Sequence, residues 1–254
     1  MEENNILHYE VVGEGTPVLL LHGFLESRLM WQNIVPKLEG YKIILVDLPG
    51  HGKSKGFSKD SWQLSDFAHA VAAVLEKERV TSVQIVGHSL GGYVALEWLA
   101  LPTEITCKQL ILLNSHPWED SPSKKKERTR VATIVAKNKN LFLSVAIPNL
   151  YLDEETFQAE ITSLIEEASQ MDTSAIVKTI IAMRDRNNYV ATIKTHAKNS
   201  AVIQGEHDRL IDAKAMSDFC TAHNIRFTCL SNVGHMAHQE SEEQVVACFK
   251  EWLK

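Results

Sequence analysis

With 254 residues and a formal net charge of −6 at pH 7, the chain can bury one large core and lacks the basic excess of a general nucleic-acid binder. No apolar run approaches the roughly 18 residues of a membrane span, and the opening residues MEENN lack the basic and apolar segments of an export signal. We therefore expect a cytoplasmic domain that binds neither nucleic acid nor membrane.

Seven short apolar runs, separated by helical patterns, predict the strands of a sheet. Near-continuous Val, Ile and Leu runs are typical of parallel strands that are covered on both faces. The runs are residues 6–12, 18–21, 43–46, 83–86, 110–113, 201–203 and 227–230. After Asp60, apolar residues at helical spacing predict a helix, with Gln63 placed as in a capping box. The pattern as a whole predicts a doubly wound, mostly parallel α/β fold.

The stretch VDLPGHGKS, residues 46–54, ends in the Gly-Lys-Ser of a phosphate-binding loop. Such a loop needs a glycine five residues before its Gly-Lys, and counting back from Gly52 gives Asp47. A carboxylate there would repel phosphate. We therefore interpret the stretch as a strand-ending turn rather than a nucleotide site.

The motif G-x-S-x-G occurs at Gly87, Ser89 and Gly91, between an apolar strand and a helical pattern. On so tight a turn the serine hydroxyl projects from the sheet, and glycines two positions to either side leave room for the backbone. The helix that follows offers N–H groups and a positive dipole to an oxyanion, with the Leu90 N–H as the nearest donor. Ser89 is therefore the candidate nucleophile.

The alternation of strands and helices stops between about Trp118 and His196. Helical patterns cover residues 123–145, 154–169, 173–184 and 189–195. We expect this block, residues 118–196, to form a helical lid inserted in a core of residues 1–117 and 197–254, over the carboxyl ends of the strands where ligands bind. Its basic opening, from Lys124 to Arg130, is expected to be a solvated helix face.

Cysteine and histidine spacing favours no metal site. Cys107, Cys220, Cys229 and Cys248 form no CxxC pair, and no HExxH occurs. We expect free, mostly buried thiols, no metal and no cofactor. His116 could point into a pocket under the lid, although an ordinary loop position is our expectation for it.

These motifs resemble the α/β-hydrolase family, and more narrowly its lidded serine-esterase branch, over nearly the whole chain. HGF at Gly23 resembles the family's oxyanion loop, which implies that the Phe24 backbone N–H is the second oxyanion donor. Residues 31–38, WQNIVPKL, resemble its first helix. DLPGHGKS resembles its D-x-x-G-x-G-x-S turn, which implies a structural loop. Because the first strand begins near Ile6, we expect a sheet of seven or eight strands.

The family resemblance also supplies the partners of Ser89, in the chain order serine, acid, histidine. AVIQGEHDRL, residues 201–210, is similar to the family's G-x-x-D after the penultimate strand, which implies Asp208 as the acid, with Glu206 and Asp212 as rivals. Gly234-His235 after the last strand is similar to its catalytic loop, with His238 as the competitor. His235 is the expected base.

A serine that is activated by a histidine and an aspartate predicts acyl transfer to water through an acyl-enzyme. The expected partner is a small, uncharged and partly apolar ester or a related acyl compound. The same residues in relatives also serve thioester cleavage, C–C hydrolysis and a menaquinone-pathway synthase reaction, and these alternatives stay open. An alternative of another class is a ligand-sensing protein that kept the fold without turnover.

Overall fold

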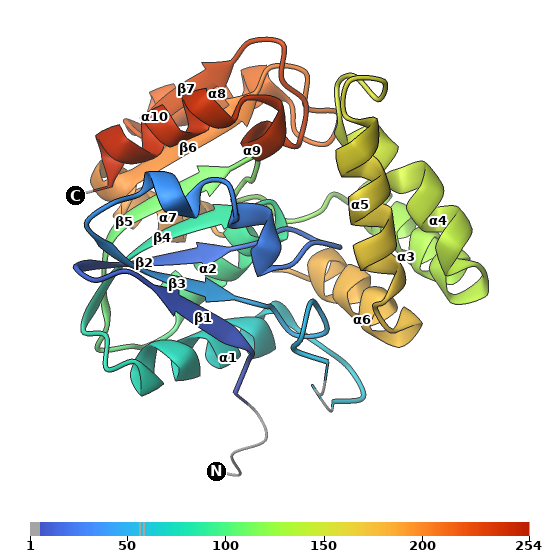
Figure 1. The fold of residues 1–254 in the computed structure, drawn as a ribbon, viewed down its shortest axis with the longest axis horizontal. Helices are drawn as coiled ribbons and strands as arrows, with labels where there is room; N and C mark the ends of the chain where they lie inside the picture. Colours follow the sequence, from blue (N-terminus) through green and yellow to red (C-terminus); the bar gives the residue numbers. More distant parts are fainter. Residues whose placement is uncertain (1–5, 56, 58, 254) are drawn as a thin grey trace.

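The computed structural model describes residues 6–55, 57 and 59–253, and its centre is a seven-stranded sheet (Figure 1). The strand order is β1-β3-β2-β4-β5-β6-β7. The strands are β1 (Tyr9–Val12), β2 (Thr16–Leu21), β3 (Tyr41–Val46), β4 (Ser82–His88), β5 (Thr106–Leu113), β6 (Ser200–Gly205) and β7 (Arg226–Leu230). Only β1 runs antiparallel to its neighbour among these strands. The mostly parallel sheet and the α/β-hydrolase fold predicted from the sequence are confirmed, with seven strands in the described residues.

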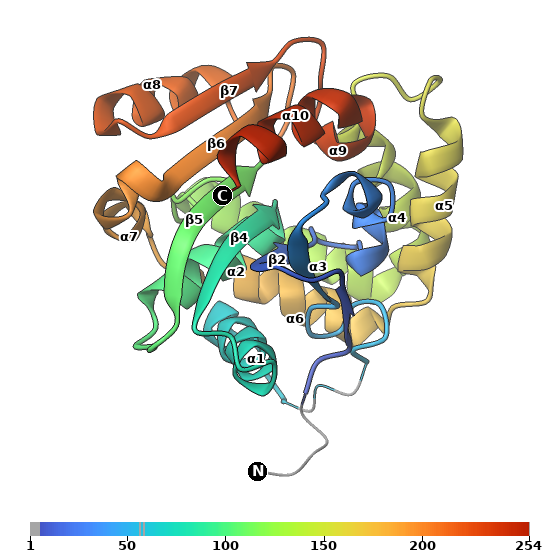
Figure 2. The same cartoon turned by 60° about the vertical axis from the view of Figure 1, so that its left-hand side comes forward.

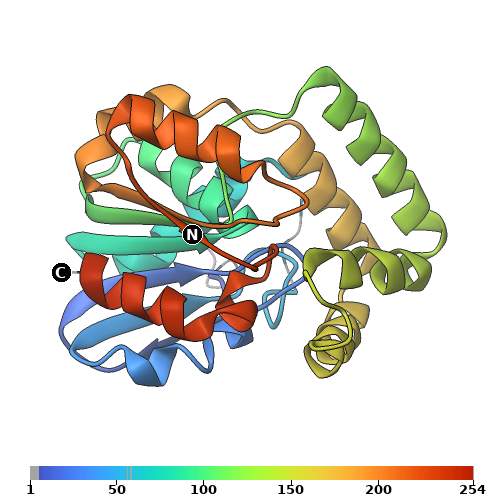
Figure 3. The same ribbon diagram turned by 90° about the horizontal axis from the view of Figure 1, so that it is seen from above.

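Helices cover both faces of this sheet. Side chains of successive strand residues point to opposite faces, so Leu19 and Leu21 pack in one apolar layer and Val18 and Leu20 in the other. The first layer is completed by α1 (Leu64–Lys77), α2 (Leu90–Ala100) and α8 (Ala213–His223), and the second by α10 (Glu242–Trp252). Figure 3 shows α8 and α10 on opposite sides of the sheet. This is the doubly wound arrangement that the apolar runs predicted.

Three predicted helix or strand boundaries are wrong, each for a local reason. Strand β1 begins at Tyr9, three residues after Ile6, which is 40% exposed. Residues 31–38 form no α-helix, because Pro36 has no N–H for a helical bond; two 3-10 turns, η2 (Arg28–Trp31) and η3 (Val35–Lys37), stand there. Helix α1 begins at Leu64; Gln63 belongs to a capping box, as predicted, but as the N-cap residue, whose N–H donates to Asp66 in the first turn.

A block of helices connects β5 to β6. It contains α3 (Pro122–Lys137), α4 (Lys139–Ala146), η4 (Pro148–Leu150), α5 (Gln158–Ser169), α6 (Thr173–Arg184), α7 (Val190–Thr195) and η5 (Ala197–Asn199). The single helix expected over 123–145 is broken at Asn138, whose side chain caps α4 by accepting from the Leu141 N–H at 3.1 Å. Figures 1 and 2 show α3 to α6 grouped at one side of the sheet.

The four cysteines are free thiols, as the sequence predicted. Cys220 and Cys248 are buried, whereas Cys229 is exposed and Cys107 is half-buried, so only part of the expected burial holds. Among the helices of the described residues, none combines the length and apolar character needed to cross a lipid bilayer. The short helix α9 (Ala237–Glu240) follows β7 and precedes α10.

Candidate active site

Ser89 lies at the tight turn from β4 into α2, with φ 48° and ψ −112°. This backbone conformation is costly for a residue with a side chain and persists only where the surroundings impose it. A Cβ on Gly87 would lie 2.5 Å from the Gly91 backbone, and a Cβ on Gly91 would lie 2.3 Å from the Leu21 carbonyl oxygen. Both distances are too short for any side chain. The two glycines of the motif are therefore required by the packing of the turn.

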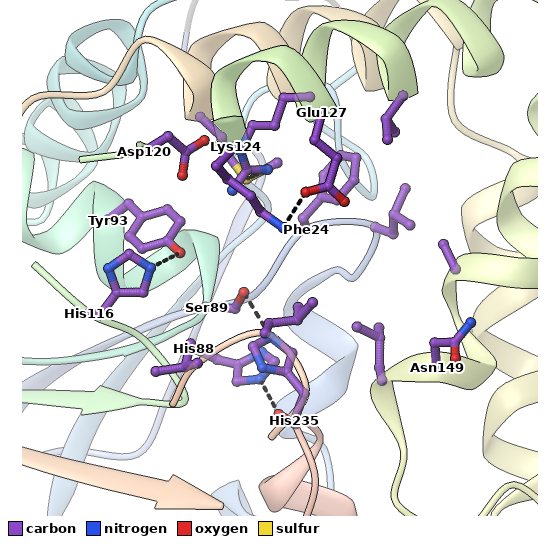
Figure 4. Close-up of a pocket in the computed structure, with 18 of the residues that line it drawn as sticks. Phe24, His88, Ser89, Tyr93, His116, Asp120, Lys124, Glu127, Asn149 and His235 are labelled. Atoms are coloured by element: carbon purple, nitrogen blue, oxygen red, sulfur yellow. Dashed lines mark hydrogen bonds and ion pairs between the residues drawn. The ribbon is translucent and has the colours of Figure 1, made fainter. Parts of the chain in front are cut away.

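The structure brings Ser89, His235 and Asp208 into one chain of hydrogen bonds, and Figure 4 shows its contact between Ser89 and His235. Ser89 Oγ lies 3.0 Å from His235 Nε2, and His235 Nδ1 lies 2.7 Å from Asp208 Oδ2. Because Nδ1 must donate to the carboxylate, the lone pair of the neutral ring is on Nε2, facing the serine hydroxyl. This arrangement can remove the serine proton.

Asp208 is held ionised by an unusually full set of donors. Asn114 Nδ2 donates to Oδ2 at 2.9 Å, and Gln204 Nε2 donates to the same oxygen at 2.8 Å. The N–H groups of Leu210 and Ile211 donate to Oδ1 at 2.8 and 3.2 Å. Burial alone would raise the pKa of Asp208, but the adjacent His235 and these donors outweigh burial and hold the pKa well below its ordinary value.

The rival residues lie elsewhere. Asp212 caps α8 by accepting from the Ala215 N–H at 2.9 Å, and Glu206 accepts from the Asn232 N–H at 3.2 Å; both are exposed. His238 is buried, with its nearest carboxylate oxygen, Glu26 Oε1, at 3.6 Å. Of the five acid and histidine candidates, the structure places Asp208 and His235 beside Ser89.

Two backbone N–H groups, those of Phe24 and Leu90, are candidate hydrogen-bond donors near Ser89. Within the part of the chain that the structure describes, neither the Phe24 N–H nor the Leu90 N–H has a hydrogen-bond acceptor. The Leu90 N–H opens helix α2, where the macrodipole favours negative charge. Phe24 borders the cavity that contains Ser89. Both N–H groups are therefore available as hydrogen-bond donors.

A buried ion pair, missed by the sequence reasoning, joins the loops around these donors. Glu26 Oε2 accepts from the Gly23 N–H at 2.6 Å and from His88 Nδ1 at 2.8 Å, and His88 Nε2 donates to the His235 carbonyl at 3.0 Å. Both ring nitrogens of His88 face oxygens that carry no hydrogen, so the ring holds two protons. The oxyanion loop, the residue before Ser89 and the loop of His235 are thus fixed to one carboxylate.

Each member of this pair stabilises the charged form of the other against the effect of burial. Burial would raise the pKa of Glu26, but the charge of His88 lowers it to about 2. Burial would lower the pKa of His88, but the Glu26 carboxylate raises it above its ordinary value. Glu26, His88 and His238 place potential ligand atoms within 4.8 Å of one another, yet both nitrogens of His88 are already used. We therefore interpret the group as a hydrogen-bonded network rather than a metal centre.

The stability of the fold should fall in mild acid because several buried histidines, among them His51 and His238, stay neutral. Burial lowers the pKa of His51 and of His238 to about 3. The unfolded chain binds protons at both below about pH 6.5, so the free energy of unfolding should drop as the pH falls from 6.5 towards 3, by up to about 1.4 kcal/mol per pH unit for each histidine. We expect a clearly lower Tm at pH 5 than at pH 7. His51→Gln should make the decline shallower, and an unchanged slope would contradict this assignment.

A cavity of about 580 Å³ adjoins Ser89. Its apolar walls come from the oxyanion loop and the helical block, and they include Phe24, Val131, Phe142, Leu150 and Met183. Lys124 and Arg128 also border it, so the basic opening of α3 is only partly the solvated face that was expected. Lys124 pairs with Glu127 at 3.0 Å and Arg128 pairs with Asp120. Both cations are therefore compensated by neighbouring carboxylates.

His116 lies in a loop, as expected, but it also borders this cavity. Asn114, Gln204 and Glu26 were not assigned a role from the sequence. Asn114 had one usable signal, since it directly follows the predicted strand at residues 110–113 and Asn tolerates the positive φ, here 45°, found at such a turn.

Comparisons with known proteins identify the family of this chain. A model of the family described as "alpha/beta hydrolase fold" matches residues 16–242. A pimeloyl-(acyl-carrier protein) methyl ester esterase of Nitrosomonas europaea is 26% identical, over 96% of this chain and 98% of that protein. A 2-succinyl-6-hydroxy-2,4-cyclohexadiene-1-carboxylate synthase of Enterobacter sp. (strain 638) is also 26% identical, over 93% of this chain and 91% of that protein.

Solved structures are similar over a comparable length. A thermophilic esterase from Thermogutta terrifontis superposes with a TM-score of 0.88 at 26% sequence identity, covering 97% of this chain and 92% of that one. Other relatives match over shorter stretches. For one of them, which is 27% identical, the match covers 64% of that protein's length.

Proposed function

Because the chain belongs to the α/β-hydrolase fold family and is a hydrolase, we propose that it cleaves a small carboxylic ester or related acyl substrate with Ser89 as nucleophile, His235 as base and Asp208 as orienting acid. The observation that carries this proposal is the continuous hydrogen-bond chain from Ser89 Oγ through His235 to Asp208. Among the described residues, the N–H groups of Leu90, next to Ser89 in the chain, and of Phe24, on the wall of its cavity, have no acceptor.

In the proposed mechanism, Ser89 Oγ attacks the acyl carbonyl carbon while His235 Nε2 takes the serine proton. The N–H groups of Phe24 and Leu90 donate to the developing oxyanion, and Asp208 stabilises the imidazolium. His235 then gives the proton to the leaving alcohol. Water, activated by the same nitrogen, attacks the acyl-enzyme, releasing the acid and restoring Ser89.

We propose that the helical block of residues 118–196 acts as a lid that sets substrate size. Val131 of α3 and Phe142 of α4 border the cavity of Ser89, so substrate would lie between these helices and the sheet. The core would then be residues 1–117 and 197–254. Cytoplasm remains the expected location.

Two candidate reactions would use the same catalytic residues. An ester substrate is supported by the names of two relatives at 26% identity, the methyl ester esterase and the thermophilic esterase. A synthase reaction is supported by the relative from Enterobacter sp., also at 26% identity. The compensated charges of the cavity favour the uncharged ester.

A panel of p-nitrophenyl esters from acetate to decanoate, assayed beside an acyl thioester, a dienoic ketoacid and the synthase substrate, tests this proposal. A cavity of about 580 Å³ should accept short and medium acyl chains, so we expect kcat/KM to be highest there. Faster turnover on one of the other three compounds than on every ester would assign that reaction instead. A single turnover without release would favour the ligand-sensing alternative.

A further inference from the structure

Tyr93 and His116 form a polar pair on the cavity wall beside Ser89 (Figure 4). Tyr93 stands one helical turn after Ser89, and its N–H donates to the Ser89 carbonyl oxygen at 3.3 Å. Side chains in a helix lean towards its N-terminus, which brings the Tyr93 ring towards the serine end of α2. Tyr93 Oη lies 3.0 Å from His116 Nε2. The mechanism proposed above uses neither residue.

The hydrogen-bond pattern decides which atom of the pair donates. Burial, followed by the nearby Arg186, lowers the pKa of His116 to about 3, so the ring is neutral and carries one proton. The Trp118 N–H donates to His116 Nδ1 at 3.2 Å, so that nitrogen is the acceptor and the proton is on Nε2. His116 Nε2 must therefore donate to Tyr93 Oη. The hydroxyl proton of Tyr93 is left without an acceptor in the described part of the chain.

The surroundings keep that hydroxyl protonated and strengthen it as a donor. Burial raises the pKa of Tyr93, so the phenol stays neutral across the physiological range. The Arg186 guanidinium lies 4.3 Å from the centre of the Tyr93 ring, and its charge draws electron density from the ring. Arg186 is itself fixed, because Nη1 donates to the Met183 carbonyl at 2.7 Å and pairs with Asp120 at 2.8 Å. Tyr93 is thus a preorganised donor at the edge of an otherwise largely apolar cavity.

We propose that the Tyr93 hydroxyl is a specificity subsite that donates a hydrogen bond to an oxygen of the substrate other than the reacting carbonyl. The substrate class is then an ester with an ether, hydroxyl or carbonyl oxygen near the scissile bond, in the acyl or the alcohol part, rather than a purely hydrocarbon ester. A hydrocarbon ester would leave the buried donor unpaired, which disfavours it. This inference rests on the proposed hydrolase function.

Matched esters that differ by one oxygen test the subsite. In the acyl pair, p-nitrophenyl methoxyacetate replaces one CH₂ of p-nitrophenyl butyrate by oxygen; in the alcohol pair, 2-methoxyethyl acetate does the same to butyl acetate. For each pair, the ratio of kcat/KM for the oxygen-containing ester to that for the hydrocarbon ester is measured in the native enzyme and in Tyr93→Phe. Because intrinsic reactivity is the same for both enzymes, dividing the two ratios removes it. We expect Tyr93→Phe to lower the ratio about three- to tenfold in at least one pair.

The control is Tyr9→Phe, which removes a tyrosine hydroxyl on β1 that bonds to Glu78 at 2.9 Å outside the cavity and should leave both ratios unchanged. Ratios in Tyr93→Phe within twofold of the native values for both pairs would overturn the inference while the hydrolase function stands. Absence of Ser89-dependent hydrolysis of every ester would overturn the proposed function and the subsite with it. Thermal melting of each variant identifies a folding defect, and His116→Phe, which removes the donor to Tyr93 Oη, should then shift the ratios in the same direction.

Discussion

Replacing Ser89 with alanine should lower kcat on p-nitrophenyl acetate by about 10⁶-fold, as loss of a triad serine does elsewhere. The variant keeps His235, Asp208 and both backbone donors, but no atom remains to form the acyl-enzyme. The only side-chain hydrogen bond recorded for Ser89 Oγ in the described structure goes to His235. Alanine also keeps the Cβ, so the strained backbone of the turn should persist. We expect the loss in kcat, with substrate binding largely retained.

Stopped-flow and steady-state assays with purified variants measure this loss. Ser65→Ala, on the far helix α1, is the matched control and should keep native activity and Tm. Activity of Ser89→Ala above one per cent of the native value would contradict the assignment of the nucleophile. A fall in activity together with a large fall in Tm would instead locate the defect in the fold of the turn.

Ser89 could be found from the sequence because its constraint is local. The strained turn, the two glycines and the flanking strand and helix all lie within a dozen consecutive residues, and the steric demand on Gly87 and Gly91 appears directly as the motif. Strands buried on both faces are equally visible, since every position of β4 from Val83 to His88 is buried and apolar residues dominate it. Contiguous constraints of this kind leave contiguous patterns.

Residues whose role depends on distant partners left no such pattern. In the sequence, Glu26 is a single acidic residue in a predicted loop. Only the folded structure shows that it accepts hydrogen bonds from Gly23 and from His88, which is 62 residues away. The sequence pattern places Tyr93 on a buried helix face, but it does not indicate that the Tyr93 hydroxyl forms a hydrogen bond with His116. Asn114 reaches Asp208 across 94 residues. Periodicity reports which face is apolar, but it does not report which polar groups the fold brings together.

The helix boundaries failed for a related reason. The residues near Pro36 have apolar spacing that suits a helix, but a missing N–H in the middle outweighs the spacing. At residues 123–145, Asn138 interrupts an otherwise continuous pattern by capping the next helix. In both cases one local hydrogen-bonding constraint, a missing N–H at Pro36 or a side-chain cap at Asn138, overrides the hydrophobic pattern of a whole segment.

Replacing Asp208 with asparagine should lower kcat about 10⁴-fold, because the change reverses the tautomer of His235. All the groups around the carboxylate are donors: four N–H groups besides the His235 ring. In the described structure, Asn114 Oδ1 and Gln204 Oε1 are buried without partners, so one of these two amides can rotate and accept one hydrogen of the new NH₂ group at the position of Oδ2. The other hydrogen of that NH₂ group then points at His235 Nδ1.

With Nδ1 accepting, the proton of the neutral ring moves to Nε2, which then donates to Ser89 Oγ and has no lone pair for the serine proton. The amide rotation keeps the new side chain hydrogen-bonded, so we expect the fold to persist while the base is lost. The matched control is Asp212→Asn on α8, since asparagine also caps helices well and this residue lies outside the hydrogen-bond chain. Comparing kcat and Tm for the two variants separates the roles: a loss of activity in Asp212→Asn, or near-native activity in Asp208→Asn, would mean that another acid orients His235.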